Sequence, residues 1–190
     1  MTTLTAYASI NISGEVKAKA DFDNLVQALA DEYARPDYLE TIIGISDGAI
    51  CDCEAARAFL LCVVRAGNTI KLCVDEARNG KLDVEDVCRE IGLWFWRYNA
   101  SDYGLDAMDI TYNPITHELH SEPEAQDGHY IPLYNAMKVL ETTGPEGLAE
   151  FVRKRDAECS LATGSGMPAA FTVSDDVLSE LLAKSDMGVA

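Results

Sequence analysis

Three histidines lie close together in the sequence, among acidic residues. His117, His120 and His129 fall within thirteen residues that also hold several carboxylates. Histidine and carboxylate side chains are the ligands that zinc and related metals take, so this region could support a metal-dependent reaction. On a strand, however, His117 and His120 point to opposite faces and cannot share an ion. We therefore expect a surface role, and a metal-dependent enzyme using His117–His129 is the less favoured alternative.

Six cysteines offer a second kind of chemistry, as thiol nucleophiles or as disulfides. Cys51 and Cys53 are separated by one residue, whereas the cysteines of redox and zinc-binding pairs are separated by two. The sequence also has no second closely spaced pair that could complete a zinc site. The start of the chain does not read as a signal peptide, so we expect a cytoplasmic protein with free, mostly apolar cysteines. Cys62 and Cys88 fall on expected core stripes. The sequence thus predicts no catalytic residue, no cofactor and no metal, and a thiol enzyme is a minor alternative.

The charge of the chain is its strongest signal. The 190 residues carry 32 acidic and 15 basic side chains, a net charge of −17, and 48% of the residues are hydrophobic, as in an ordinary globular protein. Residues 81–130 hold 11 of the acids and only 3 of the bases, and no Lys or Arg occurs between Arg97 and Lys138. Such a charge repels phosphate, which disfavours direct nucleic-acid binding and anionic membranes and favours basic protein partners.

Ten acidic residues and one tryptophan make up the predicted partner-binding site. They are Asp83, Asp86, Glu90, Asp102, Asp106, Asp109, Glu118, Glu122, Glu124, Asp127 and Trp96. The first three lie on the polar side of an expected helix, and Asp109, Glu118 and Glu122 lie on one face of an expected hairpin. Alternate residues on a strand face are about 6.6 Å apart, and phosphates follow each other about every 3.4 Å along one DNA strand. We expect the two groups to converge into one anionic surface that fits a groove meant for nucleic acid.

In size and composition the chain resembles the acidic inhibitors that phages and mobile elements direct against CRISPR complexes and restriction enzymes. The resemblance is one of charge and architecture, without a shared motif. It implies a non-enzymatic DNA mimic that binds the basic surface of a nucleic-acid-binding complex. The alternative is a helical adaptor or oligomerising subunit, including a homodimer, that uses the Trp96 region and the C-terminal helix to hold a partner or a second copy.

The first half of the chain reads as alternating strands and helices. Apolar and polar residues alternate over 3–13, which predicts a strand with one buried face. Apolar residues recur at helical spacing over 21–34, until Arg35-Pro36 ends the helix. Residues 39–46 favour a short strand, and the apolar stretch 54–66 favours a buried helix. Residues 69–78 fit a helix or a strand, and we favour the helix.

The second half begins with the clearest helical pattern. Over 82–98 apolar residues recur every three or four positions, and Trp96 points off this stripe as an interface anchor. Residues 107–121 predict a hairpin that turns at Asn113-Pro114. Two helices are expected next, over 131–142 and 145–157, the second opened by Pro145.

The expected fold class is α+β, a mainly helical single domain with a small antiparallel sheet. The sheet would hold the N-terminal strand and the 107–121 hairpin. The globular domain would span 1–158, and the Gly/Ser-rich segment 159–172 would be a flexible linker. A short amphipathic helix with Ser174 as its N-cap would complete the region 173–190, docked on its own domain or on a second copy.

Overall fold

The computed structural model describes residues 5–32, 35–36, 50–101, 105–123, 133–162, 164 and 166–185. Over these residues the fold is a single α+β domain, which confirms the expected class. The helices are α1 (Lys19–Glu32), α2 (Cys53–Ala66), α3 (Val84–Ile91), α4 (Leu133–Ala162) and α5 (Asp175–Ser185). The strands are β1 (Thr5–Val16), β2 (Arg35–Pro36), β3 (Ile70–Arg78), β4 (Trp94–Asn99), β5 (Met108–Asn113), β6 (Glu118–Pro123) and β7 (Phe171–Val173).

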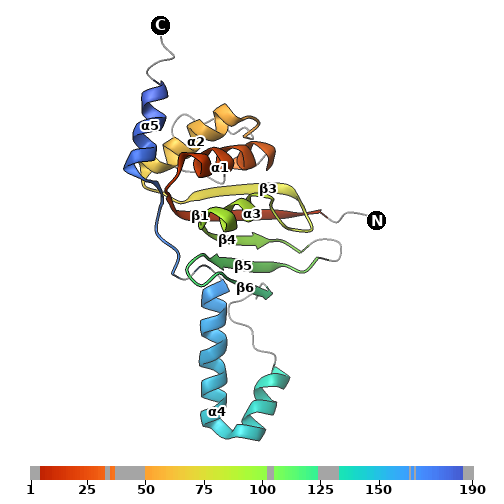
Figure 1. The fold of residues 1–190 in the computed structure, drawn as a ribbon. Coiled ribbons are helices and arrows are strands. Elements are labelled where there is room, and N and C mark those ends of the chain that lie inside the picture. Colours follow the sequence, from red (N-terminus) through yellow and green to blue (C-terminus); the bar gives the residue numbers. More distant parts are fainter. Residues whose placement is uncertain are drawn as a thin grey trace.

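The sheet is built around the N-terminal strand. Its order is β2-β3-β1-β4-β5-β6, and all of these neighbours are antiparallel. β1 follows the predicted alternation, because Ala8, Ile10 and Ile12 are buried while the residues between them are less so. These side chains join those of α1, α2 and α3 in the core, on the face of the sheet that the helices cover (Figure 1). The sheet is larger than expected, because β3 and β4 belong to it.

The helix expected over 82–98 is wrong beyond its first half, because a glycine ends it. Gly92 adopts a left-handed conformation (φ 74°, ψ 37°), and its N–H bonds to the carbonyl oxygen of Cys88. The N–H of Leu93 bonds to the same oxygen at 2.8 Å, which completes a common helix-ending motif. Trp94–Asn99 then form β4. This strand is largely buried on both faces, so its sequence lacks the alternation of apolar and polar residues that marks a strand with one exposed face. Its apolar residues therefore fit the period of a helix equally well.

Residues 70–78 form β3, so the helix that we favoured over 69–78 is also wrong. Ile70 and Leu72 are buried and Lys71 between them is exposed, which is the alternation of a strand. β3 pairs with β1 over most of its length. The other main predictions, helices over 21–34 and 54–66 and the 107–121 hairpin, are confirmed, and the strand expected over 39–46 lies outside the described residues.

Helix α4 is bent into two segments, which agrees with the two helices predicted over 131–142 and 145–157. Gly144 has non-helical angles (φ 73°, ψ −174°), and Pro145 starts the second segment. Figure 1 shows both segments beyond the β6 edge of the sheet, at the opposite end from α1, α2 and α5. Although α4 has 30 residues, neither it nor another helix in the described ranges is long and apolar enough to cross a membrane.

The C-terminal elements pack on the domain itself. β7 runs parallel to the end of β1, with Phe171 opposite Gly14. Val177 and Leu181 of α5 join Phe171 in the core. Helix α5 has the predicted extent and docks on its own chain. The expected linker over 159–172 is shorter in the structure, since α4 continues to Ala162.

A buried ion pair fastens α3 to the sheet. Glu85 and Arg97 are 1% and 5% exposed, and Glu85 Oε1 lies 2.7 Å from Arg97 Nε. Glu85 Oε1 also accepts the backbone N–H of Leu82 at 2.8 Å, at the start of α3. Arg97 Nη1 donates to the carbonyl oxygen of Gly80 and, at 2.6 Å, to Asn99 Oδ1. Burying two charges is costly, so the pair is tolerable only with these added hydrogen bonds.

Replacing one partner of this pair should destabilise the fold strongly. Arg97→Met leaves the Glu85 carboxylate buried without its cation, and we expect a loss of about 3–5 kcal/mol in the free energy of unfolding. The double variant Arg97→Met/Glu85→Gln keeps an acceptor for the N–H of Leu82 and removes the charge, so it should regain most of that loss. Urea unfolding of the native chain and both variants measures this. Equal losses in the two variants would contradict the assignment.

Candidate functional site

The hairpin β5–β6 places three of the predicted acidic residues on one face. Asp109 lies opposite Glu122, Thr111 opposite His120, and Asn113 opposite Glu118. Directly opposed residues of antiparallel strands share a face, so the predicted face of this hairpin is confirmed. β4 extends it, since Trp96 pairs with Thr111 and Tyr98 with Asp109.

The carboxylates of this hairpin face are engaged within the domain. Asp109 Oδ1 accepts a hydrogen bond from the indole N–H of Trp96 at 3.0 Å. Glu122 forms a two-pronged ion pair with Arg155 of α4, with 2.6 Å between Oε1 and Nη1. Glu118 lies 3.7 Å from His120 Nε2. Of these three contacts, only that of Glu122 is therefore with a permanent cation, whereas the contacts of Asp109 and Glu118 leave their charge in place.

Trp96 lies on strand β4, so the prediction that it projects from a helix is wrong. Its side chain is partly buried, and its indole N–H donates a hydrogen bond to Asp109. The segment after α4 crosses it, because a Cβ added to Gly164 would lie 3.3 Å from the Cβ of Trp96. Trp96 thus contacts its own chain. With α5 also packed on the core, the two elements expected to hold a partner in an adaptor are occupied within the domain.

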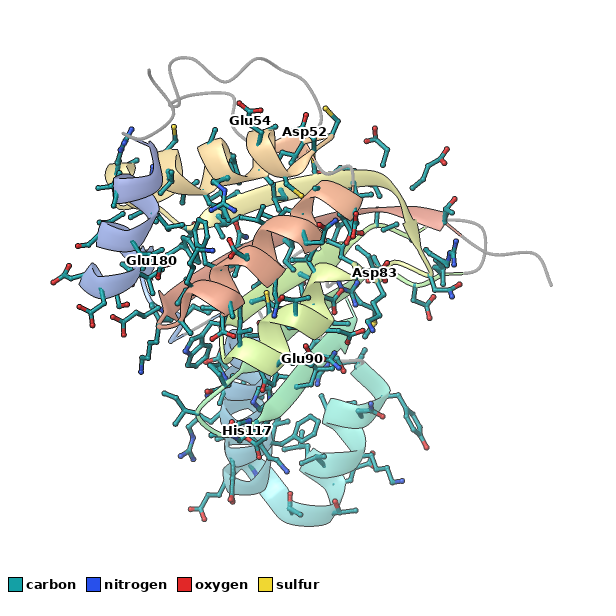
Figure 2. All side chains as sticks on the ribbon, turned by 45° about the horizontal axis from the view of Figure 1, so that its top comes forward. Asp52, Glu54, Asp83, Glu90, His117 and Glu180 are labelled. Carbon is teal, nitrogen blue, oxygen red and sulfur yellow. The ribbon has the colours of Figure 1, made fainter. Side chains whose placement is uncertain are left out.

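The acidic residues of α3 lie on the other side of the sheet. Asp83, Asp86 and Glu90 are exposed, and Figure 2 shows Asp83 and Glu90 on the side where α1 also lies. The expected convergence of this group with the hairpin acids into one surface is therefore wrong. The physical reason is the sheet itself, because α3 covers the face that carries Arg97, whereas Asp109 is on the opposite face.

The remaining predicted site residues contribute less. Asp106 is exposed, and its backbone carbonyl oxygen accepts a hydrogen bond from Asn99 Nδ2 at 2.9 Å. Asp102, Glu124 and Asp127 lie outside the described residues.

The end of α1 adds a carboxylate to the acidic side of α3. Glu32 Oε2 accepts the backbone N–H of Val84 at 3.2 Å, at the positive end of the α3 dipole. Burial raises the pKa of the Glu32 carboxyl, and the negative charges of Asp83 and Glu85 raise it further. Glu32 and Asp83 therefore repel each other at short range. We call the surface formed by Glu32, Asp83, Asp86 and Glu90 the α3 face.

Basic side chains neutralise only part of the α3 face. Asp86 pairs with Lys81 at 2.7 Å and lies 3.7 Å from Arg89. Among the described residues, no basic side chain pairs with Asp83 or Glu90. Residues three and seven positions apart lie on one side of a helix, so Asp83, Asp86 and Glu90 form a row along α3. This row keeps a net negative charge in the folded chain.

The histidines do not form a metal centre within the described residues. His117 lies in the hairpin turn with a positive φ of 58°, and its Nδ1 is 3.2 Å from the hydroxyl of Tyr112. His120 is on the hairpin face beside Glu118, and His129 lies outside the described part of the chain. No group of three or more potential ligands clusters in the part that the structure describes.

The cysteines differ in their surroundings. Cys88 is fully buried in the core, as expected, and its surroundings raise the pKa of its thiol, chiefly by burial and also through the charge of Glu85. Cys62 is partly buried, and Cys51 and Cys53 are exposed at the start of α2. The Cys53 thiol contacts Oε1 of Gln27 at 3.3 Å. Within the described ranges, the side-chain contacts of the two exposed thiols are to Asp52 and Gln27, and none is to a histidine.

Sequence reasoning missed two features. The contact of Glu32 with α3 joins residues 52 positions apart, and no local pattern reveals it. The exposure of the apolar residues of α4 was also not predicted, because their helical spacing is the same whether a stripe faces a core or solvent. Comparison with other proteins adds no relative, since no family model, curated protein or solved structure matches this chain.

Neutralising Glu32 should stabilise the domain at neutral pH. The folded-state pKa of Glu32 lies above its ordinary value of 4.5. The stability that this group contributes is therefore complete below about pH 4.5 and is lost as the pH rises through the folded-state pKa. Glu32→Gln keeps an oxygen acceptor for the N–H of Val84 and removes the charge. We expect it to be more stable than the native chain at about pH 7, with the difference vanishing near pH 4.

Urea midpoints at the two pH values measure this difference, and Asp31→Asn is the control, since Asp31 is the exposed neighbour of Glu32. The opposite result would be a Glu32→Gln variant that is less stable than the native chain at neutral pH but not at acidic pH. It would show that the attraction between the Glu32 charge and the start of α3 is larger than the cost of burying that charge.

Proposed function

We propose that this protein is a non-enzymatic inhibitor that occupies a basic, nucleic-acid-binding surface of a partner protein as a DNA mimic. The net charge of −17 supports a basic partner, because opposite charges steer association and select it. The α3 face is the surface that we assign to the contact. The observation that carries this assignment is the row of exposed carboxylates on α3, in which Asp83 and Glu90 have no basic partner among the described residues, whereas Glu122 of the hairpin is paired with Arg155.

The spacing of the α3 row suits the proposed role. Seven residues of helix separate Asp83 from Glu90, about 10 Å along the axis, which is about the length of three phosphate steps of one DNA strand. Asp86 lies between them. Its exposed ion pairs with Lys81 and Arg89 contribute little to the stability of the fold, so a cation of the partner can replace Lys81 and Arg89 beside Asp86. The repulsion between Glu32 and Asp83 would also be relieved by a cationic cleft.

Reversing the charge of the α3 row should weaken inhibition. We expect Asp83→Lys/Glu90→Lys to lose at least about tenfold in affinity, equivalent to about 1.4 kcal/mol. The matched control is Asp106→Lys/Glu118→Lys, which changes the net charge equally on residues away from α3. The measurement is protection of DNA from cleavage by a panel of restriction and CRISPR nucleases, with binding titrated for each inhibited enzyme.

Salt and competitor DNA complete the test. Binding that depends on charge should weaken as salt rises, and DNA should displace the inhibitor from its target. Inhibition that resists both, or that falls equally in the two double variants, would argue against the α3 face as a DNA mimic.

A further inference from the structure

The turn between β3 and α3 contains the pair Asn79-Gly80, whose chemistry the proposed function does not use. Of the seven asparagines in the chain, only Asn79 is followed by glycine. The side-chain amide of an asparagine is open to attack by the backbone nitrogen of the next residue, and a glycine there has no Cβ to hinder the attack. Asn79 is exposed, whereas Gly80 is buried. The pair is therefore a candidate site of spontaneous modification.

The fold holds this pair in a tight turn. Both residues have positive φ angles, 54° at Asn79 and 67° at Gly80, as in the type I′ turns that an Asn-Gly pair favours. The N–H of Lys81 donates to the carbonyl oxygen of Arg78 at 3.1 Å, and the N–H of Gly80 donates to that of Ala77, also at 3.1 Å. The nitrogen that would attack the Asn79 amide is thus engaged in a hydrogen bond of the turn.

Gly80 is also fixed by side chains of β4. Its carbonyl oxygen accepts a hydrogen bond from Arg97 Nη1. A Cβ added to Gly80 would lie 2.9 Å from Cγ of Asn99, so the glycine packs directly against that side chain. Asn99 in turn bonds to Arg97 and to the backbone carbonyl oxygen of Asp106. Gly80 can therefore move only if several of these contacts break together.

We propose that Asn79 is a site of spontaneous deamidation that the native turn protects and that unfolding exposes. The Gly80 nitrogen forms a bond to Cγ of Asn79, the bond from Cγ to Nδ2 breaks, and the proton of the Gly80 N–H leaves with ammonia. Water then opens the cyclic imide at one of its two carbonyl carbons, which gives aspartate or isoaspartate at this position. Because the attack turns the Gly80 N–H away from Ala77, the native chain reacts only when the turn opens locally.

The isoaspartyl product cannot rebuild the native turn. In isoaspartate the backbone runs through the former side chain, which lengthens it by a methylene group just before Gly80. Gly80 has no free space beside Asn99, so its hydrogen bonds with Ala77 and Arg97 cannot both form again. Because Arg97 also holds Glu85, the defect extends to the ion pair that fastens α3. Chains that stay unfolded for long are thereby converted to a form that does not refold.

The test compares deamidation of the native chain with that of the chain unfolded in guanidinium chloride, at the same mildly alkaline pH. Intact mass measures the exchange of an amide for an acid, and peptide mapping with an isoaspartate-specific methyltransferase locates it. We expect Asn79 to react at least about tenfold faster when unfolded, which corresponds to a protecting free energy of at least about 1.4 kcal/mol. Asn68 is the internal control, because the β-branched Thr69 follows it and hinders the attack in both states.

A variant of the glycine tests the chemistry without requiring a folded protein. In guanidinium chloride, Gly80→Ala should slow the reaction of Asn79 several-fold, because the added Cβ hinders the attacking nitrogen. An unchanged rate would show that the amide is lost by direct hydrolysis, without the Gly80 nitrogen.

A second variant tests the protection in the folded chain. Arg97→Met/Glu85→Gln removes the hydrogen bond to the Gly80 carbonyl oxygen, so it should raise the native-state rate at Asn79 and leave the unfolded-state rate unchanged. The matched control is Arg57→Met/Asp23→Asn, which removes an ion pair of α1 and α2 away from the turn and should change neither rate.

Refolding separates the two products. Asn79→Asp has the aspartyl product's sequence and should refold with a urea midpoint close to that of the native chain, whereas the isoaspartyl chain, purified after unfolding, should not regain native circular dichroism. Equal rates in the folded and unfolded chain, no reaction at Asn79 in the unfolded chain, or an isoaspartyl chain of native stability would each overturn the proposal. The reaction needs no partner, so these outcomes are independent of the proposed inhibition.

Discussion

The buried ion pair between Glu85 and Arg97 is the constraint on which the arrangement of the acidic surfaces depends. Burial raises the pKa of Glu85, and the guanidinium of Arg97 opposes that effect. Arg97 also bonds to the turn after β3 and to Asn99, so one side chain of β4 links α3 to that turn. Because Glu85 is held inward, the helix positions at Asp83, Asp86 and Glu90 are turned outward. The direction in which α3 presents its charge is thus set by a contact that is itself inaccessible to a partner.

The sheet separates the acidic residues into two groups that have different partners within the domain. On the face away from α3, the strands and α4 supply Trp96, His120 and Arg155 as partners for carboxylates. On the side of α3, Lys81 and Arg89 lie near Asp86, whereas Asp83 and Glu90 have no basic partner among the described residues. A chain with this composition therefore uses part of its charge to fasten the hairpin and α4, and leaves the rest at the surface.

The local patterns of the sequence predicted most of the elements, and the errors have identifiable causes. The N-terminal strand, α1, α2, the hairpin and α5 have clear periods and caps, such as Asp52, whose Oδ1 accepts the N–H of Ala55 at 2.7 Å. The helix over 82–98 failed because Gly92 was not weighed as a helix end against an apolar pattern that continues past it. The candidate site was predicted only in part. The hairpin face follows from a period of two, but the side of the sheet on which α3 packs is a long-range property that no spacing shows.

The pairing of β7 with β1 has a consequence for how the chain reaches its native state. Gly14 and Phe171 are neighbours in the sheet, although 157 positions separate them in the sequence. Phe171, Val177 and Leu181 occupy the core beside residues of the first strand and of α2. During synthesis the core of the amino-terminal part therefore stays incomplete until residues 171–181 have left the ribosome. Contacts of such high sequence separation form slowly, so a nascent or truncated chain exposes apolar surface for longer and depends more on chaperones than the modest size of the domain suggests.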